Sequence, residues 1–198
     1  MAFSTEKQRN VLVFIIFVFA LIRLFYFIKY SILSSTMWIV DNITSLAAIV
    51  LLFFFYKKIK LTILHFSFIV GFLLLHNFGT IGYYSKDIAW LPFDAWVHGF
   101  FGFIAAIIVS SYLEKEKLRF KFVFMLLLVL GMGAFHEIVE LLGAVFFGEG
   151  DGFLFFGTGD LKSFNSQWDL FSSLIGALIG YFAYRMGRLF YSSSSSSS

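Results

Sequence analysis

The sequence predicts an all-α polytopic membrane protein, a bundle of six transmembrane helices, and three observations carry that prediction. Of the 198 residues, 60% are apolar and only 14% are charged, whereas about a quarter of a soluble domain is charged. The mean hydropathy is +0.87. The apolar residues fall in six runs, and crossing a hydrocarbon core takes about 20 helical residues. We therefore expect one integral membrane domain over 1–191 and a disordered serine tail over 192–198.

The expected helices span residues 11–30, 37–56, 61–83, 92–113, 120–147 and 167–186. The first follows Lys7 and Arg9 as a signal peptide would, but its apolar run is too long and no small-residue cleavage site follows. The fifth is longer than one crossing needs, so we expect it to tilt or to leave the membrane at its end. In the sixth, Gly176 and Gly180 form a Gly-x-x-x-Gly face that predicts close helix packing.

The basic residues predict the orientation, because cytoplasmic loops of membrane proteins carry an excess of Lys and Arg. With the N-terminus inside, the cytoplasmic side holds most of the 15 basic residues, namely Lys7, Arg9, Lys57, Lys58, Lys60, Lys115, Lys117, Arg119, Lys121, Arg185 and Arg188. The outer side holds Lys29, Lys86 and Lys162. Both termini are therefore expected in the cytoplasm. The net charge of +3 says little by itself, because the basic excess follows this topology, and we expect no nucleic-acid-binding patch.

Acidic and imidazole groups lie in or beside the expected helices, although a charge near the bilayer centre costs roughly 2.5 to 3.5 kcal/mol. In the expected topology, five helices place such groups at one depth, in the outer half of the bilayer. This coincidence predicts one shared polar site, built from Asp41, His76, Asn77, Asp94, His98, His136, Glu137, Glu140 and Asp169.

Asp94 and His98 are four residues apart, so they share one helix face. This spacing suits a shared metal ion or a carboxylate that orients the imidazole. The alternative is structural: Asp94 caps the helix that begins after Pro92, and His98 makes an ordinary core hydrogen bond.

The segment His136-Glu137-x-x-Glu140 presents two acids and an imidazole on one helix face. Two such carboxylates repel each other in a low dielectric unless a proton or a cation lies between them, which indicates a metal site or a proton relay. The alternative is a salt-bridge network with Arg23 or Lys162. The segment differs from the zinc-binding His-Glu-x-x-His helix in its last residue, so peptidase activity is not predicted.

Asp160, Gln167 and Asp169 lie at the expected outer mouth of the sixth helix. Asp169 falls in the first helical turn, where a carboxylate also stabilises free backbone N–H groups. For Asp160, a plain turn is the alternative to ligation, because the loop over 148–166 is rich in turn residues.

The chain has no cysteine, which excludes disulfides, thiolate catalysis and sulfur ligands. Oxygen and imidazole ligands suit Zn, Mn or Fe, and less specifically Mg or Ca. The predicted metal ligands are Asp94, His98, Glu137, Glu140, Asp160 and Asp169, with Glu137 and His136 as catalytic candidates. The side chains expected around them are His76, Asn77, Asp41 and Gln167.

Five short polar motifs follow one another along the chain: Leu-His-Asn-Phe-Gly at 75–79, Pro-Phe-Asp at 92–94, Ala-Phe-His-Glu-Ile-Val-Glu at 134–140, Gly-Thr-Gly-Asp at 157–160 and Gln-Trp-Asp at 167–169. Over roughly 75–185 the chain resembles the YjdF-like family of prokaryotic inner-membrane proteins, a family of unknown function. The resemblance implies several membrane helices and an inner-membrane location. An aromatic residue is common in that family where this chain has His136. The resemblance therefore favours the acids over His136 as essential ligands.

Three functions follow from such a site. The first is a metal-dependent hydrolase of a lipid or lipid-linked substrate, in which metal-bound water is the nucleophile and a Glu or His is the general base. The second is transport of a cation or protons. Against it, the inner halves of the fourth to sixth helices are apolar. The third is a non-catalytic scaffold, in which the acids only tie helices together.

Overall fold

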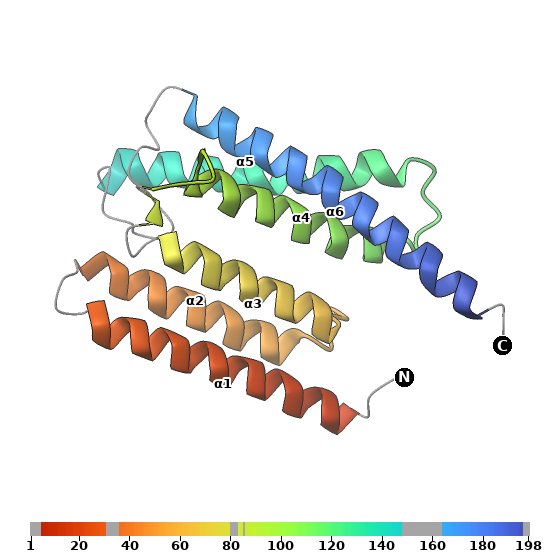
Figure 1. Cartoon of the computed structure of the whole chain (residues 1–198), viewed down its shortest axis with the longest axis horizontal. Coiled ribbons are helices and arrows are strands. Elements are labelled where there is room, and N and C mark those ends of the chain that lie inside the picture. Colours follow the sequence, from red (N-terminus) through yellow and green to blue (C-terminus); the bar gives the residue numbers. More distant parts are fainter. Residues whose placement is uncertain (1–4, 31–35, 80–82, 85, 148–163, 196–198) are drawn as a thin grey trace. The chain divides into compact units, whose positions relative to one another are not determined.

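The computed structural model describes residues 5–30, 36–79, 83–84, 86–147 and 164–195 (Figure 1). Its helices are α1 (Thr5–Tyr30), α2 (Thr36–Phe55), α3 (Ile63–Phe78), α4 (Phe93–Leu113), α5 (Lys121–Phe147) and α6 (Asn165–Ser195). A short hairpin of β1 (Asp87–Ile88) and β2 (Leu91–Pro92) precedes α4. The chain is thus largely helical, as predicted. Two helix ends differ: α3 ends before residue 83, and α6 continues past residue 186 into the serine run.

Among the described residues, four stretches are long and apolar enough to cross a membrane, judged by length and composition: Lys7–Phe25, Phe93–Leu113, Lys121–Phe146 and Asn165–Leu189. The stretches Ile43–Phe55 and Ile63–Phe78 are apolar but shorter. The 16 residues of α3 extend roughly 24 Å at 1.5 Å per residue, less than a hydrocarbon core about 30 Å thick. The membrane character is therefore confirmed, and six crossings stay a prediction.

The chain forms two compact units. The first contains α1, α2, α3 and the part of α5 from Glu140 onward. Its apolar core consists of Leu12 and Phe19 from α1, Ile49 from α2, Phe66, Val70 and Leu73 from α3, and Tyr56. These positions recur at intervals of three, four and seven residues along α1 and α3, the spacing that brings side chains to one helix face. Thr62 begins α3, and its hydroxyl accepts a hydrogen bond from the backbone N–H of His65 at 3.2 Å.

The second unit contains the hairpin, α4, α5 up to Val139, and α6, and α4 and α6 touch through their backbones. A Cβ atom added at Gly102 would overlap the carbonyl group of Ser173, and one added at Gly176 would overlap the carbonyl oxygen of Gly99. Gly180 meets the α4 backbone in the same way. We call Gly102, Gly176 and Gly180 the glycine seam. It confirms the close packing that the Gly-x-x-x-Gly pattern predicts.

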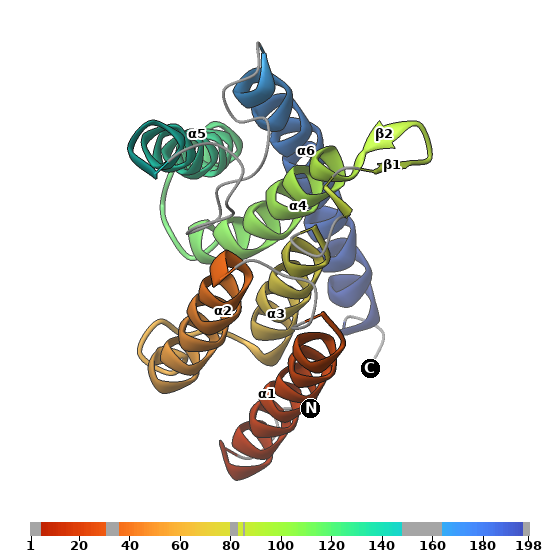
Figure 2. The same cartoon turned by 90° about the vertical axis from the view of Figure 1, so that its left-hand side faces the viewer.

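Helix α5 packs against this pair through side chains. Met125 and Val129 of α5 share a buried core with Ala105 and Ala106 of α4 and with Ala177 of α6. The rings of Phe122 and Tyr181 lie with their centroids 4.8 Å apart. Small residues on α4 and α6 therefore leave room for the larger side chains of α5. Figure 2 shows α4 crossing α6, with α5 viewed nearly along its axis.

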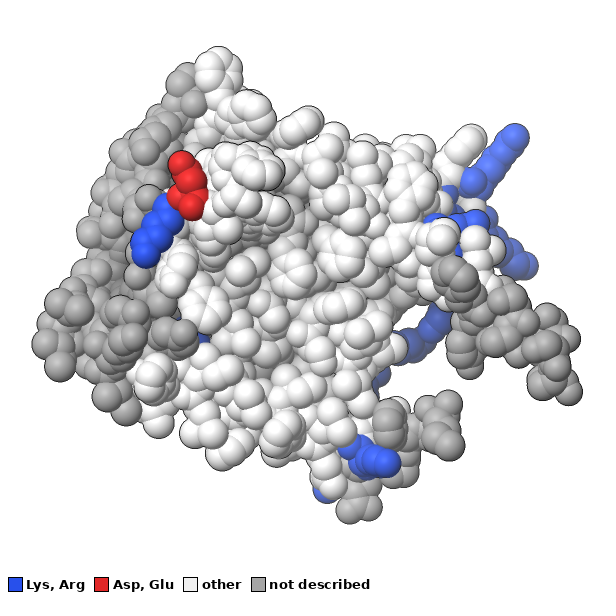
Figure 3. All heavy atoms as spheres, in the orientation of Figure 1, with Lys and Arg blue, Asp and Glu red and all other residues white. Residues whose placement is uncertain are grey.

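The outer sides of the helices are strongly apolar. On α5, Leu127, Phe135 and Phe146 are 64%, 68% and 75% exposed, and on α6 Ile179 and Phe182 are exposed as well. On the face that Figure 3 draws, the atoms of Lys, Arg, Asp and Glu lie towards the edges of the view, and the area between them is free of these residues. Apolar surface of this extent is unsuited to water and suits contact with lipid.

The hairpin before α4 was not predicted. Its strands are antiparallel, with Ile88 opposite Leu91, and the turn residues Ala89 and Trp90 have positive φ angles of 47° and 62°. Such turns normally carry Asn or Gly, so the sequence gives no turn signal here. The indole Nε1 of Trp96 donates a hydrogen bond to the carbonyl oxygen of Ile88 at 3.0 Å and ties the hairpin to α4.

We expect Ala89→Gly to stabilise the protein by about 0.5 to 1 kcal/mol, because glycine adopts a positive φ without the steric cost that alanine has there. The matched control is Ala95→Gly within α4, which should lower stability by a similar amount because glycine is a poor helix former. Unfolding by SDS in mixed micelles measures both. A destabilised Ala89→Gly variant would contradict the turn conformation.

Candidate functional site

His98, which is buried near the start of α4, has acidic groups around both ring nitrogens. Its Nε2 lies 3.5 Å from Asp94 Oδ1 and 3.9 Å from Asp169 Oδ1. Its Nδ1 lies 3.8 Å from Glu137 Oε1. We call these four residues the His98 cluster, and all of them belong to the second unit. The structure thus brings together four of the six predicted metal ligands, from three helices.

Helix geometry explains how these groups meet. Asp94 lies in the first turn of α4, after Pro92, and His98 follows one turn later on the same face. Asp169 lies near the start of α6, which begins at the same end of the unit. Glu137 lies in the later half of α5, which runs in the opposite direction. The predicted coincidence in depth is therefore realised for α4, α5 and α6.

The cluster is mostly enclosed. His98, Glu137 and Asp169 are each less than 8% exposed, whereas the Asp94 side chain is 31% exposed. Three carboxylates surround one imidazole, so even a protonated His98 could not balance three ionised acids. A buried excess of negative charge is costly unless a cation or protons offset it. Asp94, as the exposed member, marks the side from which the cluster can be reached.

Two polar residues that sequence reasoning missed support the cluster from α6. Asn165 Nδ2 donates a hydrogen bond to Asp169 Oδ2 at 2.8 Å, and Ser173 Oγ donates one to the carbonyl oxygen of His98 at 3.3 Å. Each lies four residues from Asp169, so the three form one polar face of α6. That spacing is the signal that could have identified them.

The predicted catalytic candidate His136 lies beside the cluster. Its ring centroid is 6.0 Å from that of His98, with the rings inclined at 44°. It is half-buried on α5. Glu137 is the neighbouring residue in the chain and contributes directly to the cluster.

Three other predicted residues belong to the first unit. His76 Nδ1 and the Tyr84 hydroxyl form a hydrogen bond of 2.6 Å, and Ser45 Oγ donates a hydrogen bond to Asn77 Oδ1 at 3.4 Å. Glu140 is buried, and the division between the units falls just before it. Within the first unit, the structure therefore places His76 and Asn77 in hydrogen bonds with Tyr84 and Ser45.

The remaining predicted residues contribute nothing to the described geometry of the cluster. Gln167 is exposed on α6. Asp160 lies outside the described residues, as does Lys162, and the side chain of Asp41 lies outside them too. Arg23 is buried in the first unit, where its guanidinium lies 5.5 Å from the centroid of the Phe19 ring.

Considered as ligands, Asp94, His98 and Asp169 each offer one donor atom, and these atoms lie within 4.8 Å of one another. Tetrahedral bonds of 2.0 to 2.2 Å, as zinc makes to nitrogen and oxygen, place donor atoms roughly 3.3 to 3.6 Å apart. The group therefore has the donor types and nearly the spacing to hold a metal ion.

Comparison with protein families gives a match over most of the chain. A family model described as "Predicted membrane protein (DUF2238)" matches residues 11–188, a range that runs from α1 into α6. No curated protein matches the chain, and no solved structure matches it. The family description agrees with the apolar helices and assigns no activity.

Proposed function

Because the chain belongs to the DUF2238 family of predicted membrane proteins, we propose that it is an integral membrane metalloprotein that binds a divalent cation at the His98 cluster. The ligands are Asp94, His98 Nε2 and Asp169. The observation that carries this proposal is the convergence of two carboxylates on one imidazole nitrogen, at 3.5 and 3.9 Å. A cation between these atoms relieves the repulsion of the two acids and uses all three groups.

Glu137 is the orienting partner in this proposal. It lies on the Nδ1 side of His98, at 3.8 Å, where a carboxylate accepts the Nδ1 proton and leaves the Nε2 lone pair for the metal. Metal-bound histidines commonly have such a carboxylate, which fixes the tautomer and raises the basicity of the ring. Three protein ligands leave a coordination position for water or substrate, as in catalytic zinc sites.

The reaction we propose is hydrolysis of a lipid or lipid-linked substrate. A bound divalent metal supplies hydroxide at neutral pH, and His136, half-buried beside the cluster, is the candidate general base. A cation or proton pathway is less well supported. Within the described part of the second unit, the layer below the cluster is apolar and buried: Ala105, Ala106, Met125, Val129 and Ala177.

The experiment that tests the metal site is metal analysis by mass spectrometry on detergent-purified protein after exposure to Zn²⁺, Mn²⁺ or Fe²⁺. We expect about one ion per chain, the stoichiometry of a mononuclear site. The double variant Asp94→Asn/Asp169→Asn should lose it. Asp87→Asn, which removes an exposed acid on the hairpin, should retain it. Folded wild-type protein that binds none of these ions would refute the site.

We expect Asn165→Ala to weaken metal affinity by about 10- to 100-fold, the usual effect of removing a partner that orients a metal-binding carboxylate. Gln167→Ala is the matched control, because this exposed neighbour on α6 makes no described contact with the cluster, and it should leave the affinity unchanged. Competition with a fluorescent chelator measures both. Equal affinities in the two variants would contradict the positioning role of Asn165.

For the topology, we propose six membrane crossings with both termini in the cytoplasm of a prokaryotic cell, as the resemblance to YjdF-like proteins and the basic residues suggest. The cluster then lies in the outer half of the bilayer. The chain has no cysteine, so single cysteines report sidedness directly. Asp87→Cys should react with an impermeant maleimide in intact cells, and Lys117→Cys should react only after the membrane is opened. The reverse labelling pattern would show that the orientation in the membrane is opposite to the one proposed.

A further inference from the structure

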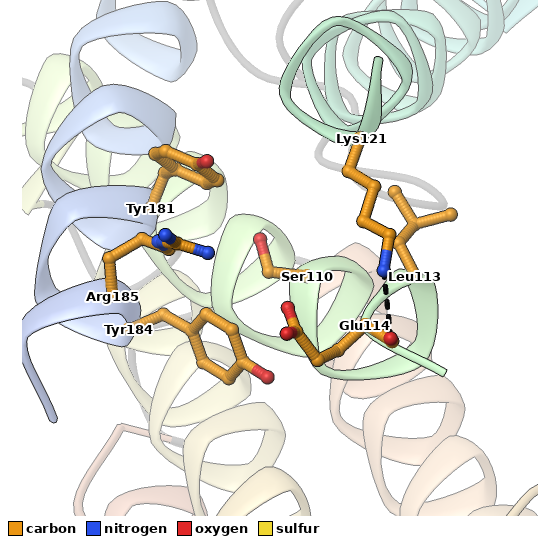
Figure 4. A pocket seen from close by; sticks show the side chains of 7 residues that line it. All are labelled: Ser110, Leu113, Glu114, Lys121, Tyr181, Tyr184 and Arg185. Atoms are coloured by element: carbon orange, nitrogen blue, oxygen red, sulfur yellow. Dashed lines mark hydrogen bonds between the residues drawn. The ribbon is translucent and has the colours of Figure 1, made fainter. Parts of the chain in front are cut away.

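A second polar site lies at the other end of α4, α5 and α6. A pocket there is lined by Ser110, Leu113 and Glu114 of the α4 end, Lys121 of α5, and Tyr181, Tyr184 and Arg185 of α6 (Figure 4). It is a small recess that is partly open to its surroundings. Along α4, Ser110 is roughly 18 Å from His98 at 1.5 Å per residue, so the pocket is separate from the metal site.

The balance of charge in this pocket is positive. Glu114 is the acid in its lining, and its carboxylate forms an ion pair with Arg188, which neutralises it. Lys121 Nζ donates a hydrogen bond to the backbone carbonyl oxygen of Glu114 at 2.8 Å, which holds the ammonium group at the rim (Figure 4). Arg185 extends from α6 toward Ser110 in the same view. Two cationic groups and the Glu114 carboxylate therefore line the space, and the carboxylate is already paired with Arg188.

The Ser110 hydroxyl gives separate evidence that the pocket binds a polar ligand. The residue is 6% exposed, and its hydroxyl has no hydrogen-bond partner among the described residues. A serine in a helix ordinarily bonds to a carbonyl of the preceding turn, as the adjacent Ser111 does, donating to the Ile108 carbonyl oxygen at 2.7 Å. A buried hydroxyl left without a partner is destabilising, and an oxygen atom of a ligand in the pocket would supply the missing hydrogen bond.

We propose that this pocket binds a phosphate group, carried either by the headgroup of an anionic phospholipid or by free phosphate. The lining provides the donors that phosphate oxygens accept from: a guanidinium for paired hydrogen bonds, an ammonium and hydroxyl groups. The membrane-crossing stretch of α4 ends at Leu113, so the pocket lies at the level of lipid headgroups. Basic pockets between membrane helices bind such headgroups in other proteins.

The test is native mass spectrometry of the whole protein in detergent, titrated separately with phosphatidylglycerol, phosphatidylcholine and inorganic phosphate. We expect phosphatidylglycerol to bind more tightly than phosphatidylcholine, and Arg185→Gln to weaken that binding about tenfold, the loss of one charge-assisted hydrogen bond. The matched control is Lys117→Gln, which removes an exposed charge near the same helix ends but outside the pocket. It should bind as wild type does.

Ser110→Ala keeps the result interpretable if Arg185→Gln folds poorly. It removes one hydroxyl from a buried position, so it should preserve the fold and still weaken phosphate binding severalfold. Comparable binding of inorganic phosphate would identify free phosphate as the source, and binding of the anionic lipid alone would identify the headgroup. The proposal is overturned if neither phosphate source binds, or if Arg185→Gln and Ser110→Ala both bind as Lys117→Gln does.

Discussion

Gly176→Leu should leave almost no folded protein, because a side chain at this position would occupy the space that the α4 backbone fills. A Cβ atom alone would overlap the carbonyl oxygen of Gly99, and leucine adds three further carbons. Overpacking between side chains typically costs about 1 to 3 kcal/mol. Here the obstacle is backbone, which cannot rotate away, so we expect a loss above about 3 kcal/mol. The readouts are the yield of monodisperse protein in size-exclusion chromatography and the SDS concentration at half-unfolding.

The controls for this variant are two other glycines of the membrane helices. Nothing lies within 4 Å of a Cβ atom added at Gly131 of α5 or at Gly187 of α6. Gly131→Leu and Gly187→Leu change the same residue type in the same way, so they should purify like the wild type. If Gly176→Leu matched them in yield and stability, the backbone contact between α4 and α6 would be disproved.

Removal of divalent cations should produce the second large effect. A ligand that binds only the folded state stabilises it by about 2.7 kcal/mol when its free concentration is 100 times its Kd. Wild-type protein stripped by a chelator should therefore lose about that much stability relative to the metal-loaded protein. The physical cause is the return of repulsion among Asp94, Glu137 and Asp169 around His98. SDS unfolding with and without the chelator measures the difference.

The same measurement on His98→Gln separates a metal effect from a general effect of the chelator. This variant lacks the imidazole ligand, so its stability should be the same with and without metal. Asp87→Asn, with the cluster intact, should keep the full difference. A wild type that is equally stable in both conditions would contradict cation binding at the cluster, and it would do so without any assay of activity.

The fold was predictable to the extent that hydropathy determines it. Uninterrupted apolar runs fixed the positions of the helices, and the Gly-x-x-x-Gly pattern identified the face of α6 that meets α4. The hairpin was not predictable, because Ala89 and Trp90 hold a turn that glycine or asparagine usually forms. The prediction also extended the third helix to residue 83, across Gly-Thr-Ile-Gly at 79–82, whereas α3 ends at Phe78.

The sequence predicted how far along each helix the residues of the candidate site lie. It did not predict which side of each helix faces the site. Alternating helices bring residues near the start of one helix level with those near the end of the next, which correctly grouped His98 with Glu137 and Asp169. The same reasoning included His76, which forms a hydrogen bond with Tyr84 within the first unit, and its place in the site stays a prediction. Depth is one coordinate of three, and the angular position of a helix depends on its packing. Asn165 was not predicted as a site residue because the prediction began from charged and imidazole groups in apolar helices, and Asn165 carries no charge.

The glycine seam has a consequence for which ions the cluster can accept. Asp94 and His98 stand on one of the helices that it joins, and Asp169 stands on the other. Backbones in direct contact cannot slide or rotate past each other without collision, so the three side chains that we propose as ligands keep their spacing before any ion binds. A prearranged set of three donors discriminates by ionic radius. It suits small ions with bonds of about 2.0 to 2.2 Å and excludes calcium, which needs six to eight oxygens at about 2.3 to 2.6 Å.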